Sequence, residues 1–342
     1  MKRGFKALTI YWLLLLLCAN FIWYKEKEME FRIPKGWPSP TFDLKKNKFT
    51  RSGFELGRKL FYEPILSRDS SISCESCHLS YTAFTHADHK LSHGIHGQVG
   101  TRNAPSMVNL AWATSFMWDG GVNNLEVQPI NPITNPVEMD LDLQTAVKRL
   151  QRSALYRKMF YKVYGDSVIT SAKLLRSLAL FSAALVSCNS KYDSVMSGNR
   201  NVRFSENESK GYALFKQHCS SCHKEPLFTD HSFRNNGLPM DTVLKDVGRM
   251  KITRSPSDSL KFKVPTLRNI EYSAPYFHDG RARKLKDVME HYHTGIQQGP
   301  TLDPLLKTGI ALSKEEKKDL IAFLKTLSDK SFIYNSEFRP LP

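Results

Sequence analysis

Hydrophobic residues recur at helical spacing in three long segments of the chain. Residues 143–165 and 171–188 carry apolar positions three and four residues apart, and residues 313–328 do the same after a capping box from Ser313 to Glu316. No run alternates apolar and polar residues as a half-buried strand would. Long segments rich in glycine, proline and asparagine separate the helices. The pattern predicts a mostly α fold with long irregular loops, which a bulky cofactor would help to fill.

The chain also repeats a short pattern of residues. "GRKLF" at 57–61 and "GYALF" at 211–215 each precede a pair of cysteines, and "CHLSYTAFT" at 77–85 matches "CHKEPLFTD" at 222–230. Phe-Thr follows closely behind the histidine in both copies. One repeat with a period of about 154 residues indicates two related domains rather than a solenoid. We place these domains at residues 51–200 and 201–342.

The first residues have the features of an export signal. Three basic residues precede an apolar run of 18 residues at 7–24, which is near the lower limit for crossing a bilayer. No small-x-small cleavage site stands out, so residues 1–24 are predicted to be a signal anchor or signal peptide, with lipidation at Cys18 as a further alternative. Residues 25–50 are charged, contain three prolines and read as a linker. These features predict a periplasmic protein whose membrane contact is limited to the N-terminal segment.

The net charge narrows the range of partners. The formal charge is +16 over 342 residues, with a pI of about 9.5. Such a balance suits an acidic partner protein or an anionic surface. The basic residues form no long block, so binding to nucleic acid is not expected.

The cysteine spacing carries the strongest chemical signal. "CESCH" supplies Cys74, Cys77 and His78, and "CSSCH" repeats the motif. Two cysteines three apart can each form a thioether with a haem vinyl group, and the adjacent histidine then ligates the iron. A zinc ribbon needs two closely spaced cysteine pairs, and a thioredoxin-like motif needs no histidine. The second copy supplies its three residues in the same order: Cys219, Cys222 and His223. Two covalently bound haem c groups are therefore predicted, which also places the chain outside the cytoplasm.

Further motifs resemble those of the bacterial dihaem cytochrome c peroxidase family, which also includes a dihaem enzyme that matures tryptophylquinone. The resemblance extends from about residue 50 to about residue 330 and is carried by five segments in matching order: "GTRNAPSMVNL" (100–110), "FMWDGG" (116–121), "NPVEM" (135–139), "VPTLRNI" (264–270) and "APYFHDGR" (274–281). It implies two cytochrome c-like helical domains with one haem each and a calcium ion between them. The first haem would be peroxidatic and the second would relay electrons.

The resemblance also assigns roles to individual residues near the first haem. Glu138 occupies the position of the family's distal glutamate, the acid–base group needed to cleave the peroxide bond. Gln128 matches the distal glutamine, and Pro132 matches a proline that lines the same pocket. Trp118 matches the tryptophan between the haems, whose indole can carry an electron hole. Outside the family context, Glu138 reads as an ordinary acid before a helix, and Trp118 reads as a core residue.

Calcium ligands follow from the same comparison of motifs. Asn103 matches a side-chain ligand, and Ser273 and Pro275 match positions that offer backbone carbonyls. Oxygen donors of this kind suit a hard cation. The family usually has threonine where this chain has Ser273, a change that a carbonyl ligand tolerates.

The sequence leaves two ligand positions open. Counting from His278 places Tyr292 where the classical peroxidases of the family have the methionine that is the sixth ligand of the second haem's iron. The rivals within one helical turn are Met289, His291 and His293. At the first haem, a loop with four histidines could supply a removable ligand. His96 lies one residue from the family position, and without such a ligand the first haem is open at rest.

Three functions remain compatible with these motifs. The first is a cytochrome-c peroxidase that reduces hydrogen peroxide with electrons from a small c-type cytochrome or cupredoxin, favoured if acidic. The second is a peroxide-driven oxidase that modifies tryptophan or tyrosine of a partner protein, which Tyr292 supports. The third is a dihaem electron carrier without catalysis, which has no use for Glu138 or Gln128. Members of the family are often dimers, so a homodimer is compatible with the resemblance.

Overall fold

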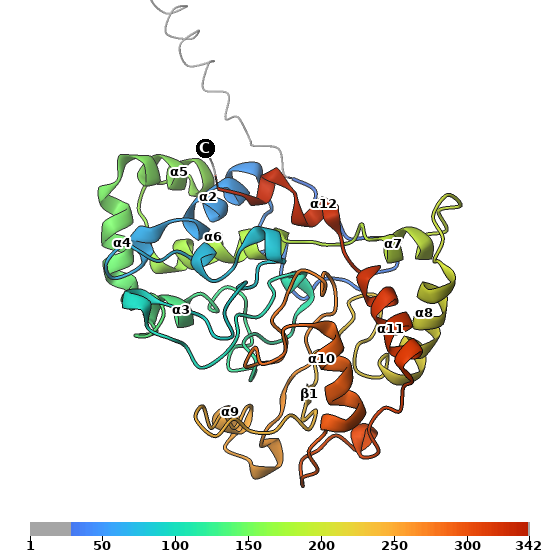
Figure 1. The fold of residues 1–342 in the computed structure, drawn as a ribbon. Coiled ribbons are helices and arrows are strands. Elements are labelled where there is room, and N and C mark those ends of the chain that lie inside the picture. The colour runs from blue at the N-terminus through green and yellow to red at the C-terminus, as the bar shows by residue number, and fades with distance from the viewer. Residues whose placement is uncertain (1–28, 341–342) are drawn as a thin grey trace, which may run out of the picture.

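The computed structural model describes residues 29–340, and the predicted signal segment at 1–24 lies outside them. Helices and irregular loops make up nearly all of the described chain, which confirms the mostly α class (Figure 1). Two short strands, β1 (Phe233–Arg234) and β2 (Phe262–Lys263), form an antiparallel pair. Between residues 29 and 340, no helix is both long and apolar enough to cross a membrane. The helices are α2 (Arg51–Phe61), α3 (Ile130–Thr134), α4 (Leu143–Arg152), α5 (Ala154–Tyr164), α6 (Ser171–Ala184), α7 (Lys191–Met196), α8 (Glu206–His218), α9 (Met250–Thr253), α10 (Leu285–Glu290), α11 (Lys314–Lys325) and α12 (Lys330–Ile333).

Two pairs of packed helices organise the molecule, and each pair crosses at a glycine of the sequence repeat. A Cβ on Gly57 of α2 would lie 2.2 Å from the carbonyl oxygen of Ser177 in α6. A Cβ on Gly211 of α8 would lie 1.9 Å from the carbonyl oxygen of Asp319 in α11. Neither position has room for a side chain. The repeated "GRKLF" and "GYALF" segments are therefore the crossing points of two equivalent helix pairs.

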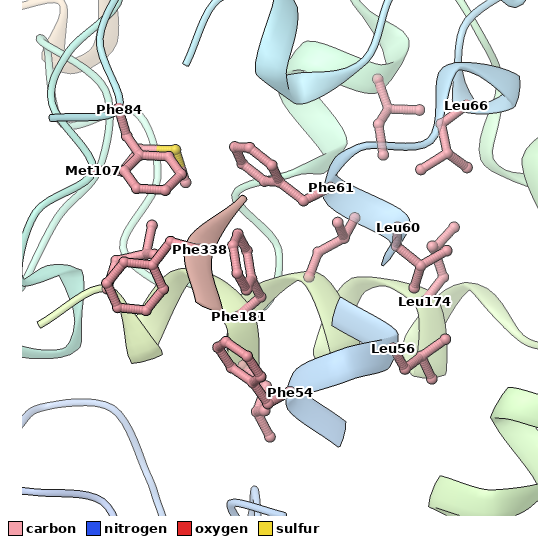
Figure 2. Packing of buried hydrophobic residues seen from close by; sticks show 14 of the residues in the cluster. Phe54, Leu56, Leu60, Phe61, Leu66, Phe84, Met107, Leu174, Phe181 and Phe338 are labelled. Carbon is pink, nitrogen blue, oxygen red and sulfur yellow. The ribbon is translucent and has the colours of Figure 1, made fainter. Parts of the chain in front are cut away.

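The first core lies between α2 and α6. Aromatic side chains from both helices meet there, with Phe61 and Phe181 centroids 5.1 Å apart (Figure 2). Phe338, near the end of the described chain, packs into the same cluster together with Phe332 and Ile333 of α12. In Figure 1 the red C-terminal segment accordingly runs from α11 through α12 toward α2. Residues near the end of the described chain thus complete the core that α2 begins.

The second core lies between α8 and α11. Phe215 of α8 and Phe323 of α11 are fully buried, with ring centroids 5.1 Å apart. Tyr192 of α7 also belongs to this cluster, although α7 precedes α8 in the sequence and is separate from it. The structure thus has two helical cores of related design, while the proposed boundaries at 51–200 and 201–342 remain a prediction.

The predicted helix at 143–165 is two helices in the structure. Ser153 ends α4 and caps α5, because its hydroxyl accepts a hydrogen bond from the backbone N–H of Tyr156. The capping box from Ser313 to Glu316 is present at the start of α11, as the sequence predicts. Helix α6 ends at Ala184, before the predicted limit at 188.

Residues 29–50, part of the predicted linker, lie against the folded body. The backbone N–H of Phe42 donates to Ala111 O at 3.0 Å, and Trp112 Nε1 donates to Pro38 O at 2.7 Å. Trp37 stacks on the guanidinium of Arg268, whose carbon lies 4.6 Å from the ring centroid. This segment therefore contacts elements from both halves of the molecule.

Candidate functional site: two cavities behind the Cys-x-x-Cys-His motifs

Each Cys-x-x-Cys-His motif borders a cavity. The first cavity, of about 570 Å³, is lined by Cys74, Cys77 and His78. The second cavity, of about 220 Å³, is lined by the corresponding residues Cys219, Cys222 and His223. All four motif cysteines are free thiols, so each pair is available for thioether bonds. Both motifs therefore present the groups that a covalent haem c requires.

The two motif histidines are held in the same way. Nδ1 of His78 lies 2.7 Å from Phe84 O, and Nδ1 of His223 lies 3.1 Å from Phe228 O. A hydrogen bond from Nδ1–H to a carbonyl leaves Nε2 unprotonated and free to ligate iron. Phe84 and Phe228 both adopt a left-handed backbone conformation, with φ of 57° and 55°. The sequence repeat marked this Phe-Thr pair, but only the structure reveals its role.

The acid–base residue predicted from the sequence lines the first cavity. Glu138 lies there with Gln128 and Pro132. Asn135 Nδ2 donates to Glu138 Oε1 at 2.9 Å, which orients the carboxyl group. Burial raises the pKa of Glu138, and the hydrogen bond from Asn135 only partly offsets that shift. A raised pKa makes a carboxylate a stronger base, which suits a group that must accept a proton and then return it.

Gly94 is a site residue that the motifs did not reveal. Its Cβ, if present, would lie 2.1 Å from Val137 O and 2.5 Å from Glu138 Cα. The next residue, Ile95, donates its backbone N–H to Glu138 O at 2.7 Å. The loop at 94–95 therefore packs closely against the backbone of Glu138 and holds it in position. Only a contact between distant segments carries this information, so a single sequence holds no signal for it.

The loop histidines do not line the first cavity. His96 is largely exposed and lies 3.6 Å from Asp69, measured between Nδ1 and Oδ2. His86, His89 and His93 instead pack against one another, with ring centroids 4.6–6.2 Å apart. Within residues 29–340, His78 is thus the one histidine that borders this cavity.

Trp118 lines both cavities. Its Nε1 donates to Asn103 O at 2.8 Å, which fixes the indole ring between the two motifs. Asn103 itself donates from Nδ2 to Pro275 O at 2.6 Å, while its buried Oδ1 has no partner. Ser273 lines the second cavity beside Asn103 and Pro275. The three predicted calcium ligands thus lie along the same cavity, and the unpaired amide oxygen of Asn103 is a donor of the kind that a hard cation takes.

Tyr292 and Met289 line the second cavity, and the other two rivals do not. His291 Nε2 lies 3.0 Å from Asn236 O, and His293 Nδ1 lies 3.1 Å from Ile310 O. Tyr292 lies in a π-helical turn, His291–Gly295, of a kind that is frequent at functional sites. Burial raises the pKa of the Tyr292 phenol to about 12.

Two related helical cores, each with a Cys-x-x-Cys-His motif beside a cavity, define a c-type cytochrome with two haems. Comparison with known proteins agrees. Residues 51–201 match the family model described as di-haem cytochrome c peroxidase, and residues 208–328 match the model described as cytochrome c.

Individual relatives cover nearly the whole chain. The methylamine utilization protein MauG of Methylophilus methylotrophus is 34% identical over 91% of this chain and 92% of its own length. The cytochrome c551 peroxidase of Nitrosomonas europaea is 35% identical over 80% of this chain and 79% of its own. The crystal structure of a MauG-like protein associated with microbial copper homeostasis has a TM-score of 0.83 and 32% identity, over 91% of this chain and 99% of that one. The chain belongs to the di-haem cytochrome c peroxidase family. Membership implies two c-type haems, a peroxide substrate and a redox donor.

Proposed function

We propose that the protein reduces hydrogen peroxide to water with two electrons from a small redox protein. The observation that carries this proposal is the first cavity, where Glu138 and Gln128 accompany Cys74, Cys77 and His78. An electron carrier has no use for a buried acid–base group beside its haem. When bound, the haem of this cavity supplies the iron at which peroxide is reduced.

Glu138 moves the proton that the reaction requires. Its Oε1 accepts the hydrogen bond from Asn135, so Oε2 is free to take a proton from one oxygen of peroxide, the oxygen that would face the haem iron. The same atom then returns the proton to the departing oxygen, which leaves as water. Two electrons and two further protons complete the reduction to two waters. Gln128, which lines the same cavity, offers an amide that can hydrogen-bond the substrate.

Electrons reach the first cavity from the second through Trp118. This indole borders both cavities, which supports a role as the oxidisable group between the two haems. Its N–H donates to the backbone carbonyl of Asn103, and a carbonyl cannot take up the proton. An electron hole on Trp118 therefore keeps its N–H, so transfer through the ring needs no proton movement.

Tyr292 is the proposed sixth ligand of the second haem. The phenol lines the second cavity, and His291 and His293 are engaged by backbone carbonyls. A phenolate is a harder, anionic ligand than a thioether and favours ferric iron. Met289 also borders the cavity and is the remaining rival.

A calcium ion is proposed at Asn103, Ser273 and Pro275. The unpaired Oδ1 of Asn103 and the adjacent Pro275 carbonyl support it, since both are oxygen donors. The ion would join the loop that carries Trp118's hydrogen-bond acceptor to the loop that borders the second cavity.

The electron donor is proposed to be an acidic c-type cytochrome or cupredoxin in the periplasm. The net charge of +16 supports an acidic partner, and covalent haem attachment supports export. A second candidate function is the peroxide-driven oxidation of tryptophan or tyrosine in a partner protein. The similarity to methylamine utilization protein MauG and the position of Tyr292 favour this alternative.

A stoichiometric assay tests the proposed function. Peroxide is added to the purified dihaem protein with a reduced acidic cytochrome, and donor oxidation is followed optically. We expect two donor molecules oxidised per peroxide, with a rate that falls as ionic strength rises because the partners carry opposite charges. Peroxide consumption without donor oxidation, but with covalent oxidation of an added partner protein, would favour the second candidate. If no peroxide is consumed, the remaining function is that of a dihaem electron carrier without catalysis.

The first haem is expected to be high-spin in the fully oxidised protein. Between residues 29 and 340, His78 is the one histidine that borders the first cavity, so no second histidine is in place to bind the iron there. The electronic spectrum should contain a high-spin ferric band, and peroxide should react without prior reduction. His96→Ala should leave that band unchanged, since its side chain is largely exposed. A purely low-spin spectrum that becomes high-spin in His96→Ala would contradict the open site.

A further inference from the structure

Lys263 occupies an unusual position between the two haem cavities. It ends β2, and its side chain lines the first cavity, the second cavity and a third cavity of about 60 Å³. Trp118 lines the same three spaces, and the backbone N–H of Lys263 donates to Trp118 O at 2.8 Å. The lysine therefore stands where the haem sites adjoin, next to the indole between them.

The Lys263 ammonium group has no carboxylate partner among residues 29–340. Its Nζ donates to the carbonyl oxygen of Ser115 at 2.8 Å, which uses one of its three protons. The carboxylate of Asp119 acts on it electrostatically, but that carboxylate already forms an ion pair with Arg102, with 2.6 Å between Asp119 Oδ2 and Arg102 Nη1. The Phe116 ring, 5.9 Å away, supplies only a weak cation–π contact.

The arginines of the cavity walls make the contrast clear. Arg102 in the first cavity is paired with Asp119 and Asp246, and Arg234 in the second is paired with Asp230 and Asp303. These guanidinium groups are already neutralised by the protein. Lys263 is not, and burial lowers its pKa to about 8. Its charge also contributes, after burial, to lowering the pKa of His231 to about 4.

A desolvated cation without a counter-ion is costly, so a bound anion is expected at this place. Haem brings such anions, because each ring carries two propionate carboxylates. The thioether bonds tie the vinyl groups to the cysteines, and the propionates must then lie elsewhere along the cavity wall. We propose that the ammonium of Lys263 is the counter-ion of a haem propionate where the two cavities adjoin. The inference rests on the two haems of the proposed function and is independent of peroxide turnover.

The proposed pair has an electrical consequence. A fixed positive charge beside a haem and beside Trp118 favours their reduced states over their oxidised states. Removing that charge leaves the propionate uncompensated and stabilises ferric iron. Lys263 is thus a positioning and tuning residue for electron transfer between the haems, not a group that touches peroxide.

Potentiometric titration of Lys263→Met, with both haems monitored optically, tests the proposal. We expect at least a tenfold shift of one haem's equilibrium toward the oxidised state, which corresponds to about 59 mV for a one-electron couple. Lys263→Arg keeps the charge and should stay within threefold of wild type. Lys251→Met is the matched control, because Lys251 also lines the first cavity but is exposed. A folded Lys263→Met protein with two haems and both equilibria within threefold of wild type would overturn the proposal.

The wild-type protein supplies an independent measurement in case Lys263→Met does not fold. An ion-paired lysine keeps its proton, so both haem potentials should be constant between pH 7 and pH 9. A potential that falls across pH 8 would mean that Lys263 titrates unpaired, and would also overturn the proposal. Of the groups that face it, Asp119 and Arg102 are paired with each other, and His231 titrates well below this range. Loss of peroxide turnover with these redox results intact would count against the proposed function alone.

Discussion

Glu138→Gln is expected to lower peroxide turnover by about 10²–10⁴-fold, the usual contribution of a positioned acid–base group. Glutamine preserves the size of the side chain and an oxygen for the hydrogen bond from Asn135, but it cannot accept a proton. The measurement is the steady-state rate of donor oxidation at saturating peroxide. Glu315→Gln, at an exposed glutamate in α11, provides a matched control that should retain full turnover.

The pH dependence of the wild-type enzyme provides a second readout of the same group. The base must be ionised to act, and burial raises the pKa of Glu138 above its ordinary value. Turnover should therefore fall as the pH drops through that raised pKa, and recover above it. In Glu138→Gln the acid limb should disappear. If Glu138→Gln keeps the wild-type turnover and the same fall in turnover at low pH, the proton transfer belongs to another residue.

Arg268→Met is expected to destabilise the folded protein by about 3–5 kcal/mol, the usual cost of removing one partner of a buried ion pair. Arg268 is fully buried, with nitrogens 2.8 and 2.9 Å from the two carboxylate oxygens of Asp193 and 2.8 Å from Pro226 O. Burial alone would raise the pKa of Asp193, but the guanidinium outweighs it and holds the pKa below its usual value. Without Arg268, the carboxylate is left without its partner, and the Trp37 ring loses its stacked cation.

Chemical denaturation followed by circular dichroism measures this loss. Lys325→Met removes an exposed cation that lies 3.3 Å from Glu271, and it should cost less than about 1 kcal/mol. The double variant Arg268→Met with Asp193→Asn should recover part of the lost stability, because it leaves no unpaired charge. Equal effects of Arg268→Met and Lys325→Met would show that the buried pair contributes no more than a surface pair.

The sequence predicted the parts of the fold that depend on local patterns. The capping box at Ser313 and the two copies of the glycine-to-phenylalanine segment were visible because each is a fixed spacing of residue types. The break at Ser153 was missed, since the apolar stripe continues across it and hides the cap. Periodicity reports which face is buried, and a single polar residue within it carries no separate signal.

The site was predictable to the extent that a motif carries it. The Cys-x-x-Cys-His spacing defines both haem positions, and Glu138, Gln128 and Trp118 do line the expected cavities. The contacts that position these groups were not predictable. Gly94 acts through the backbone of Glu138, and Lys263 matters because no carboxylate among residues 29–340 forms an ion pair with it. Both depend on distances between segments that are far apart in the sequence.

The place of Phe338 in the first core has a consequence for biosynthesis. Helices α2 and α6 are synthesised long before residues 329–338, yet Phe332, Ile333 and Phe338 are part of the cluster between them. The apolar face between α2 and α6 therefore stays open, wherever the chain folds, until these C-terminal residues pack against it. A chain truncated before residue 329 would therefore fold with a defect in the first core, although every other buried residue of that core had been synthesised.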